Sequence, residues 1–186
     1  GGQAGLVVAS RLSENSQIKV AVIEAGTAGT GNNETQSIDI PAANLYKSGV
    51  KSSLDWEYQT VNQIYMNGKP SSWPRGKVLG GSSAINGMYY IRPTSKEHNT
   101  WAQLIGDKKT WGWKAMLNAY KKLENYVHPI DDVAKHVNIQ WDDSSHGTNG
   151  PLYVSYPGYT YPPVGDFINT SSTVAIPFTA NADGGN

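Results

Sequence analysis

One glycine-rich track constrains this chain more than any other stretch of its sequence. It runs from Ser72 to Pro93 and reads SWPRGKVLGGSSAINGMYYIRP. Its Gly80-Gly81 pair lacks Cβ atoms, so the backbone there can approach a flat or anionic group closely. Ser82 and Ser83 follow with hydroxyls suited to the exposed N–H groups of a helix start. Taken alone, the glycine pair is equally typical of a turn between two packed elements.

The amino end has the pattern of the second half of a βαβ unit. After residues 1–5, GGQAG, comes LVVASRLSE, in which Leu6, Ala9 and Leu12 share one face of a predicted helix. Residues 19–25, KVAVIEA, are rich in β-branched side chains and predict a buried strand. A glycine-rich turn, a helix and a strand in this order are typical of a dinucleotide-binding fold.

The spacing of these residues fits half of a G-x-G-x-x-G fingerprint. Gly2 and Gly5 match its second and third glycines, and Glu24 follows Gly5 by nineteen residues, near the position of a carboxylate that binds a ribose hydroxyl. The helix start at Gly5 would offer N–H groups and a positive dipole end to a diphosphate. Without a ligand, the glycines would serve helix–strand packing and Glu24 would be a solvated strand-end carboxylate. The Glu24 carboxylate would repel the 2′-phosphate of NADP, so NADP is disfavoured, but the carboxylate does not discriminate between FAD and NAD.

Several segments together resemble one enzyme family. Residues 75–93, RGKVLGGSSAINGMYYIRP, resemble the first signature of the glucose-methanol-choline (GMC) family of FAD-dependent oxidoreductases. Three further segments are similar to segments of the family: LDWEYQT at 54–60, WGW at 111–113 and HGTNGPLYV at 146–154. The resemblance covers essentially the whole chain but only the amino-terminal part of the family. It implies an α/β chain with an FAD/NAD(P)-binding Rossmann-like fold, incomplete because its first strand would lie upstream, and the start of a substrate-binding α+β part.

The resemblance also implies which residues line the cofactor, FAD. From the amino-terminal fingerprint they are Gly2, Gly5, Glu24, Ala25 and Gly26. From the signature they are Arg75, Val78, Gly80, Gly81, Ser82, Asn86, Gly87, Met88 and Tyr89, the last four lying against the isoalloxazine ring. We expect residues 1–100 to be a partial FAD-binding domain. Residues 101–186 would be helical and irregular support that leads into a truncated substrate-binding part.

The activity implied by the resemblance is hydride transfer from a CH–OH group of an alcohol or sugar to flavin N5, followed by electron transfer to oxygen or a quinone. The family's catalytic histidine lies near the carboxyl terminus, and nothing here matches that region, so none of His98, His128, His136 and His146 takes its role. We therefore expect the isolated fragment neither to fold stably nor to turn over substrate. Substrate identity, oxidase or dehydrogenase chemistry, the mode of FAD attachment and the oligomeric state stay open. So do two alternatives, an FAD-containing hydroxynitrile lyase and a non-catalytic nucleotide-binding protein.

The amino-acid composition limits the classes of partner and of site that can be expected. Fifteen basic and fifteen acidic residues balance, which gives no reason to expect nucleic acid or a membrane surface as a partner. The absence of cysteine excludes disulfides and thiolate metal sites, and the neighbouring Asp131-Asp132 and Asp142-Asp143 pairs do not predict a metal site either. Sequons at Asn33 and Asn169 are consistent with a secreted, extracellular protein, with a cytoplasmic one as the alternative.

Six expectations concern structural roles. Trp56 is expected in core packing, Arg92 at the surface, and His146 in a structural turn. Trp113, Met116, Leu117, Tyr120 and Leu123 form an apolar stripe at helical spacing, which predicts a core-facing helix. Residues 131–145 are expected to be loop-like, and residues 166–174 are expected to begin a helix.

Overall fold

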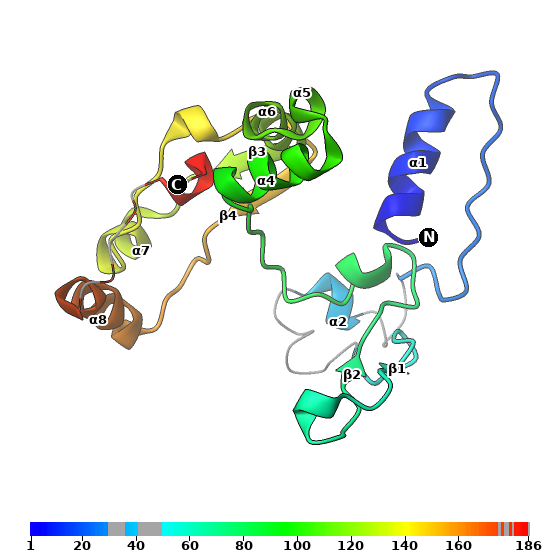
Figure 1. Cartoon of the computed structure of the whole chain (residues 1–186), viewed down its shortest axis with the longest axis horizontal. Helices are drawn as coiled ribbons and strands as arrows, with labels where there is room; N and C mark the ends of the chain where they lie inside the picture. Colours follow the sequence, from blue (N-terminus) through cyan, green and yellow to red (C-terminus); the bar gives the residue numbers. More distant parts are fainter. Residues whose placement is uncertain (30–35, 41–49, 175, 177–178, 180, 186) are drawn as a thin grey trace. The chain divides into compact units, whose positions relative to one another are not determined.

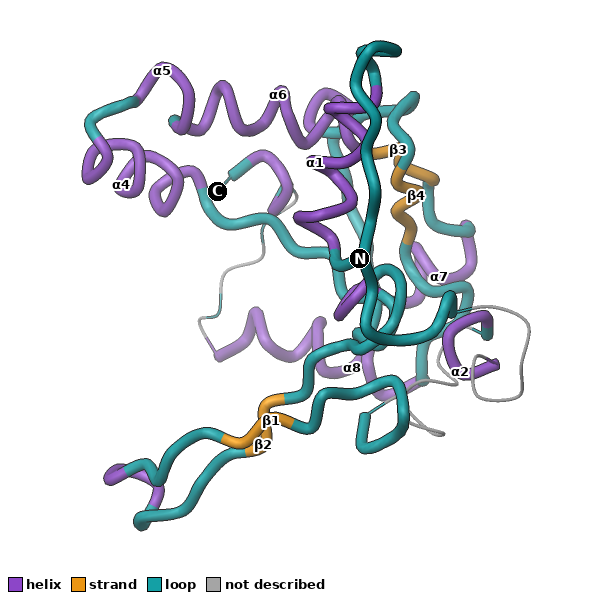
Figure 2. The backbone as a smooth tube through the Cα atoms, turned by 90° about the vertical axis from the view of Figure 1, so that its right-hand side faces the viewer, coloured by secondary structure: helices purple, strands orange, loops and turns teal. Residues whose placement is uncertain are grey.

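The computed structural model describes residues 1–29, 36–40, 50–174, 176, 179 and 181–185, shown in Figures 1 and 2. The chain divides into two compact units, Gly1–Tyr89 and Tyr90–Asn186. Each is described here by itself. The predicted functional division into residues 1–100 and 101–186 stays a prediction.

The first unit begins with the predicted helix, α1, over Gln3–Ser13. Leu6 and Ala9 of its apolar face are half-buried. Residues 19–25 were expected to form a strand, and that expectation is wrong for this structure: they run back beside α1 without strand pairing (Figures 1 and 2). Strand geometry needs a neighbouring backbone to accept and donate hydrogen bonds, and no described segment lies alongside residues 19–25 as a strand.

The core of this unit lies beneath the glycine-rich track. Leu54, Val78 and Ile85 are buried against one another, and Ala84 and Ile38 pack on them. Ile38 comes from the short helix α2, Gln36–Asp39. A 3-10 turn, Gly81–Ser83, lies between Val78 and Ile85 of the track. The core therefore fixes the track at Val78 and Ile85, on both sides of the glycine pair.

A two-stranded ribbon leads into the track. Strand β1, Tyr58–Gln59, pairs antiparallel with β2, Ser72–Trp73 (Figure 2). Between them lie a 3-10 turn, Ile64–Met66, and the predicted tight turn at Asn67-Gly68, where both residues have positive φ angles of 54° and 68°.

Trp56, just before β1, does not pack in a core as expected. Its side chain is 41% exposed and stacks on Tyr58, with ring centroids 5.8 Å apart, while the Lys77 ammonium lies 4.9 Å from the indole centroid. A ribbon of two strands leaves both faces open, so alternating aromatic residues on one face contact one another and nearby cations instead of a core.

The second unit is helical with one small sheet. Its main elements are α4 (Ser95–Ile105), α5 (Lys108–Trp111), α6 (Trp113–Leu123), β3 (Glu124–Val127), α7 (Asp131–His136), β4 (Leu152–Ser155) and α8 (Pro162–Ser171), with 3-10 turns at Asp143–Ser145, Ser172–Val174 and Ala182–Gly184. Strands β3 and β4 pair in parallel, with Glu124 opposite Leu152, as Figure 2 shows. Most of β4 thus comes from the family-like segment 146–154.

Three other expectations for this unit are corrected in part. The apolar stripe of α6 is only half-buried among the described residues, and Leu123 at its end is exposed. Residues 131–136 form a helix, not a loop, because Asp131 and Asp132 stand in its first turn, where acidic side chains stabilise a helix. Helix α8 begins at Pro162, earlier than residue 166, since proline suits the first turn of a helix.

A buried group of charged side chains organises this unit, and Arg92 is part of it instead of lying at the surface. The Arg92 and Glu124 side chains are 1% and 0% exposed, and Arg92 Nη2 lies 2.6 Å from Glu124 Oε1. The same Glu124 oxygen accepts a hydrogen bond from the Gly147 N–H at 2.8 Å and lies 3.1 Å from Nδ1 of His146. We call Arg92, Glu124, His146 and the Gly147 N–H the Glu124 hub.

The hub connects segments that are far apart in the sequence. Arg92 Nη1 donates to the carbonyls of Ser145, at 2.7 Å, and Asp183, at 3.0 Å. Burial alone would lower the pKa of Arg92, yet hydrogen bonding and the charge of Glu124 raise it above its ordinary value. Isolated buried charges are costly, so this pairing is what makes their burial possible. The rings of His146 and Tyr126 stack with their centroids 3.8 Å apart, which fits the structural role expected for His146.

Candidate functional site

Two glycine segments that are distant in sequence meet in the first unit. The Gly80 N–H donates to the Gly1 carbonyl at 2.8 Å, and Gly2 forms an isolated parallel bridge with Gly80. Gly81 has a φ of 58°, and a Cβ placed on it would lie 2.8 Å from the Gly2 Cα. Only glycine fits this approach without displacing backbone. The fingerprint and the signature are thus brought together.

A second contact joins the loop after residues 19–25 to the same track. The Leu79 N–H donates to the Thr27 carbonyl at 2.9 Å, and Thr27 bridges Val78 in parallel. A Cβ on Gly26 would collide with the Lys77 carbonyl, so this position also requires glycine. We call the surface formed by Gly1, Gly2, Gly26, Gly80 and Gly81 the glycine cradle.

Glu24 stands at the edge of the cradle. Its Oε1 accepts a hydrogen bond from the Gly26 N–H at 2.9 Å, and its Oε2 lies 3.1 Å from the amino-terminal ammonium of Gly1. The Gly26 hydrogen bond and that ammonium lower the pKa of Glu24 below its ordinary value. The carboxylate is therefore ionised at neutral pH, and its side chain keeps 19% of its surface exposed. It can accept a hydrogen bond from a ligand hydroxyl.

The amino-terminal end of α1, directly after Gly2, supplies backbone N–H groups that can donate to a ligand. The first intrahelical bond runs from the Leu6 N–H to the Gly2 carbonyl, at 2.9 Å. The N–H groups of Gln3, Ala4 and Gly5 precede it, and none of the described residues accepts from them. Gly5 is exposed, and a Cβ on it would meet nothing within 4 Å among the described residues. Packing inside this unit therefore does not explain glycine at this position.

The other predicted signature residues differ in how they are placed. The side chain of Val78 is buried in the core, so only its backbone faces the cradle. Ser82 is exposed, and its Oγ accepts from the Gly76 N–H at 3.1 Å. The Arg75 guanidinium donates to the Pro74 carbonyl and lies 5.5 Å from the Trp73 ring centroid. Ala25 is exposed between Glu24, at the edge of the cradle, and Gly26, which is part of it.

Residues 86–89 form an exposed turn farther along the chain. Met88 has a φ of 61°, and its N–H donates to Asn86 Oδ1 at 2.9 Å. The side chains of Met88 and Tyr89 are 59% and 84% exposed. The hydrogen bonds that join the two glycine segments reach Gly80 and do not include this turn. The roles predicted for Asn86, Gly87, Met88 and Tyr89 stay predictions.

Asp55 is a positioning residue that sequence reasoning missed. It is buried, and its two oxygens accept from the backbone N–H groups of Lys51, Glu57 and Arg75 at 2.9–3.0 Å. Burial alone would raise its pKa, but these hydrogen bonds lower it. Asp55 thereby fixes the residue at which the signature begins. The available signal was its place directly before Trp56 in the LDWEYQT segment, which was read only as part of the family resemblance.

The four histidines all contact neighbours within the second unit. Their partners are Tyr120 for His98, Asp143 for His128, the Pro162 carbonyl for His136 and Glu124 for His146. Across the described residues no three histidine, aspartate or glutamate side chains gather into a metal-binding group. Likewise, none of the described helices has the length and apolar character needed to cross a membrane.

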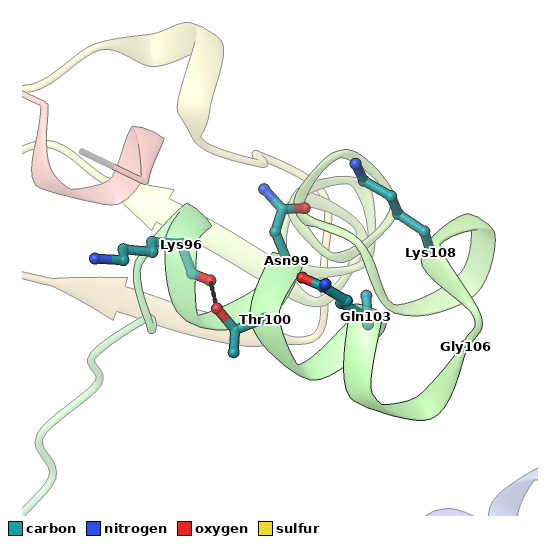
Figure 3. A pocket seen from close by; sticks show the side chains of 7 residues that line it. Lys96, Asn99, Thr100, Gln103, Gly106 and Lys108 are labelled. Atoms are coloured by element: carbon teal, nitrogen blue, oxygen red, sulfur yellow. Dashed lines mark hydrogen bonds between the residues drawn. The ribbon is translucent and has the colours of Figure 1, made fainter.

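Two hollows in the second unit contain none of the predicted site residues. One lies along α4 and α5 and is lined by Lys96, Asn99, Thr100, Ala102, Gln103, Gly106 and Lys108 (Figure 3). In it the Thr100 hydroxyl donates to the Lys96 carbonyl, and no carboxylate or imidazole lines it. The other lies between residues 137–141 and α8, next to His146 and Asp183. The glycine cradle is therefore the better candidate for the cofactor.

Known proteins match the chain along nearly all its length. The family model described as GMC oxidoreductase matches residues 2–185. A GMC oxidoreductase family protein of Malassezia sympodialis, Mala s 12, is 46% identical over 94% of this chain and 28% of its own. A pyranose dehydrogenase of Agaricus xanthodermus is 40% identical over 83% of this chain and 24% of its own. The chain thus spans less than a third of these relatives.

Solved structures agree with this match. An FAD-dependent oxidoreductase from Chaetomium thermophilum superposes with a TM-score of 0.84 at 31% identity, over 100% of this chain and 30% of its own. A pyridoxine 4-oxidase from Mesorbium loti gives a TM-score of 0.77 at 31% identity, over 97% of this chain and 32% of its own.

Proposed function

Because this chain belongs to the GMC oxidoreductase family, we propose that it is the amino-terminal, FAD-binding portion of an enzyme that oxidises a CH–OH group of an alcohol or sugar. The observation that carries the proposal is the meeting of the fingerprint and the signature. The Gly80 N–H donates to the Gly1 carbonyl, Thr27 bridges Val78 of the signature, and Glu24 accepts from the Gly26 N–H. Three segments needed to hold an extended dinucleotide thus lie together.

The residues of the cradle fit FAD. Glycine is required at positions 26 and 81 by close backbone approach, which keeps this surface free of side chains. The N–H groups of Gln3, Ala4 and Gly5, at the positive end of α1, would bind and orient the diphosphate. The ionised Glu24 would accept a hydrogen bond from a ribose hydroxyl. The Ser82 hydroxyl is exposed beside the glycine pair and would add a polar contact.

The chemistry comes from the cofactor. When bound, FAD accepts a hydride from the substrate carbon at its N5 position and passes the electrons to oxygen, a quinone or another acceptor. One of the similar proteins is named pyranose dehydrogenase, which supports a sugar or another alcohol as the electron donor, and another is named an FAD-dependent oxidoreductase, which supports the cofactor. The group that takes the hydroxyl proton would lie in the part of the enzyme outside the present residues.

The test uses the full-length protein. Heat-released flavin is identified by chromatography, and the visible flavin absorption is followed anaerobically while sugars, aryl alcohols and simple alcohols are added. The proposal predicts FAD and bleaching by at least one alcohol or sugar. Protein without flavin, or FAD that none of these donors reduces, would contradict it.

Secretion is proposed on separate grounds. Asn169 of the Asn-Thr-Ser sequon is exposed on α8, whereas the Asn33 sequon lies outside the described residues. Mass spectrometry of peptides from the natively produced protein tests this. A glycan on Asn169 supports passage through the secretory pathway, and an unmodified Asn169 counts against it.

A further inference from the structure

The turn at residues 86–88 begins directly after a fixed point. Ile85 is buried with Leu54 and Val78, so the backbone is held there. The next residue, Asn86, is exposed, and its Oδ1 accepts a hydrogen bond from the Met88 N–H at 2.9 Å. The chain therefore changes direction within two residues of leaving the core.

Met88 has an unfavourable backbone conformation. Its φ of 61° lies in the left-handed region, which residues with a Cβ rarely adopt. Strain of this kind persists only where neighbouring groups hold it, and it gathers at functional sites. The Asn86 side chain is such a group, because the side-chain carbonyl of asparagine stabilises a turn by accepting from the backbone two residues on.

The turn presents large side chains outward. Met88 and Tyr89 are 59% and 84% exposed, and they belong to the stretch that the family resemblance places beside the isoalloxazine ring. A peptide segment that lies against a flat ring needs a fixed direction more than it needs one particular side chain. The observed turn supplies that direction.

We propose that Asn86 is a positioning residue: its side chain holds Met88 in the left-handed conformation, and this turn sets how residues 87–89 meet the flavin. Asn86 thus acts through the backbone of Met88 and not by its own contact with the cofactor. The inference rests on the proposed function, since it deepens the role of the same site.

Glycine provides the decisive test, because it adopts a positive φ without penalty. In the full-length enzyme we compare Asn86→Ala, Met88→Gly, Met88→Ala and the doubles Asn86→Ala/Met88→Gly and Asn86→Ala/Met88→Ala. Asn86→Asp is the conservative variant, since a carboxylate accepts the same hydrogen bond. Three quantities are measured: the FAD dissociation constant after reconstitution, the flavin reduction potential and the thermal midpoint of the apoprotein.

The expected pattern is a rescue. Asn86→Ala weakens FAD binding about tenfold, which corresponds to about 1.4 kcal/mol, and shifts the reduction potential. Adding Met88→Gly restores the FAD dissociation constant to within about threefold of the wild-type value and reverses the shift in reduction potential, because glycine adopts the turn without being held. Adding Met88→Ala restores neither, since alanine keeps the penalty. Asn86→Asp behaves as wild type at neutral pH.

Other outcomes would overturn the inference. An Asn86→Ala/Met88→Gly double that stays as weak as Asn86→Ala would assign Asn86 a direct contact with the cofactor. Equal rescue by glycine and alanine would assign the effect to the Met88 side chain. If Asn86→Ala fails to fold, a failure of Asn86→Ala/Met88→Gly to restore the apoprotein midpoint contradicts the inference. Wild-type protein without FAD would contradict the proposed function and the inference together, whereas FAD-replete wild type without rescue contradicts the inference alone.

Discussion

The glycine cradle of the first unit and the Glu124 hub of the second are built in opposite ways. The cradle is made of backbone, kept bare because a Cβ at Gly26 or Gly81 would collide with it. The hub is made of charged side chains, with Glu124 fully buried between Arg92, His146 and the Gly147 N–H. Next to the cradle, the N–H groups of Gln3, Ala4 and Gly5 stay available to a ligand, whereas the hub pairs its opposite charges with each other. The difference separates a surface suited to binding from one that supplies stability.

The largest effect is expected from removing the carboxylate of the hub. Glu124→Ala leaves the Arg92 guanidinium buried without its partner, and breaking such a pair costs about 3–5 kcal/mol of unfolding free energy. Urea unfolding of the full-length protein measures this. The matched control is Glu14→Ala, which removes an exposed pair with Arg11 and should cost at most about 1 kcal/mol. Similar losses for both variants would contradict the buried role of the hub.

The next effect concerns the cradle and should appear in binding more than in stability. Gly81→Val places a branched side chain at a φ of 58° and against Gly2. We expect FAD affinity in the full-length protein to fall about a hundredfold, about 2.7 kcal/mol, which is within the usual cost of overpacking. Flavin fluorescence on reconstitution measures it, with far-ultraviolet circular dichroism to confirm folding.

Gly158→Ala is the control for that variant, because its Cβ would meet nothing within 4 Å among the described residues. It should bind FAD as wild type does. If folded Gly81→Val retained wild-type affinity, the cradle would not be the cofactor site.

Asp55 extends the comparison, because this buried carboxylate accepts hydrogen bonds from backbone N–H groups instead of pairing with a cation. Asp55→Asn keeps the shape but weakens three hydrogen bonds from backbone N–H groups, so we expect a loss of about 1–2 kcal/mol at neutral pH. The folded pKa of Asp55 is lowered from 3.8, so its stabilising contribution is complete above that value and is lost as the pH falls below it. The stability difference between wild type and Asp55→Asn should therefore shrink on acidification below 3.8.

A difference that stayed constant down to strongly acidic pH would show that the Asp55 charge is not what matters. Unfolding free energies of both proteins at a series of pH values decide this.

What the sequence predicted well is local. The apolar spacing of residues 6–12 predicted α1, Asn67-Gly68 predicted a tight turn, and the Gly80-Gly81 pair predicted close backbone approach, because each depends on the residue itself or on near neighbours. The family resemblance then related the two glycine segments, which no local pattern connects.

The features that the sequence did not predict depend on contacts between residues that are far apart in the chain. The Arg92–Glu124 pair joins residues 32 positions apart, and nothing around Arg92 distinguishes a buried arginine from an exposed one. Residues 19–25 have a strand-like pattern. A strand needs a second strand to pair with, and none of the described residues forms one beside them. Trp56 has a core-like composition, yet the two-stranded ribbon around it offers no core.

The central claim is that the glycine cradle holds FAD, and an experimental structure of the full-length protein tests it most directly. The account predicts FAD with its diphosphate at the N–H groups of Gln3–Gly5 and a ribose hydroxyl within hydrogen-bond distance of Glu24. A flavin bound elsewhere, with Glu24 and Gly80-Gly81 remote from it, would contradict the account.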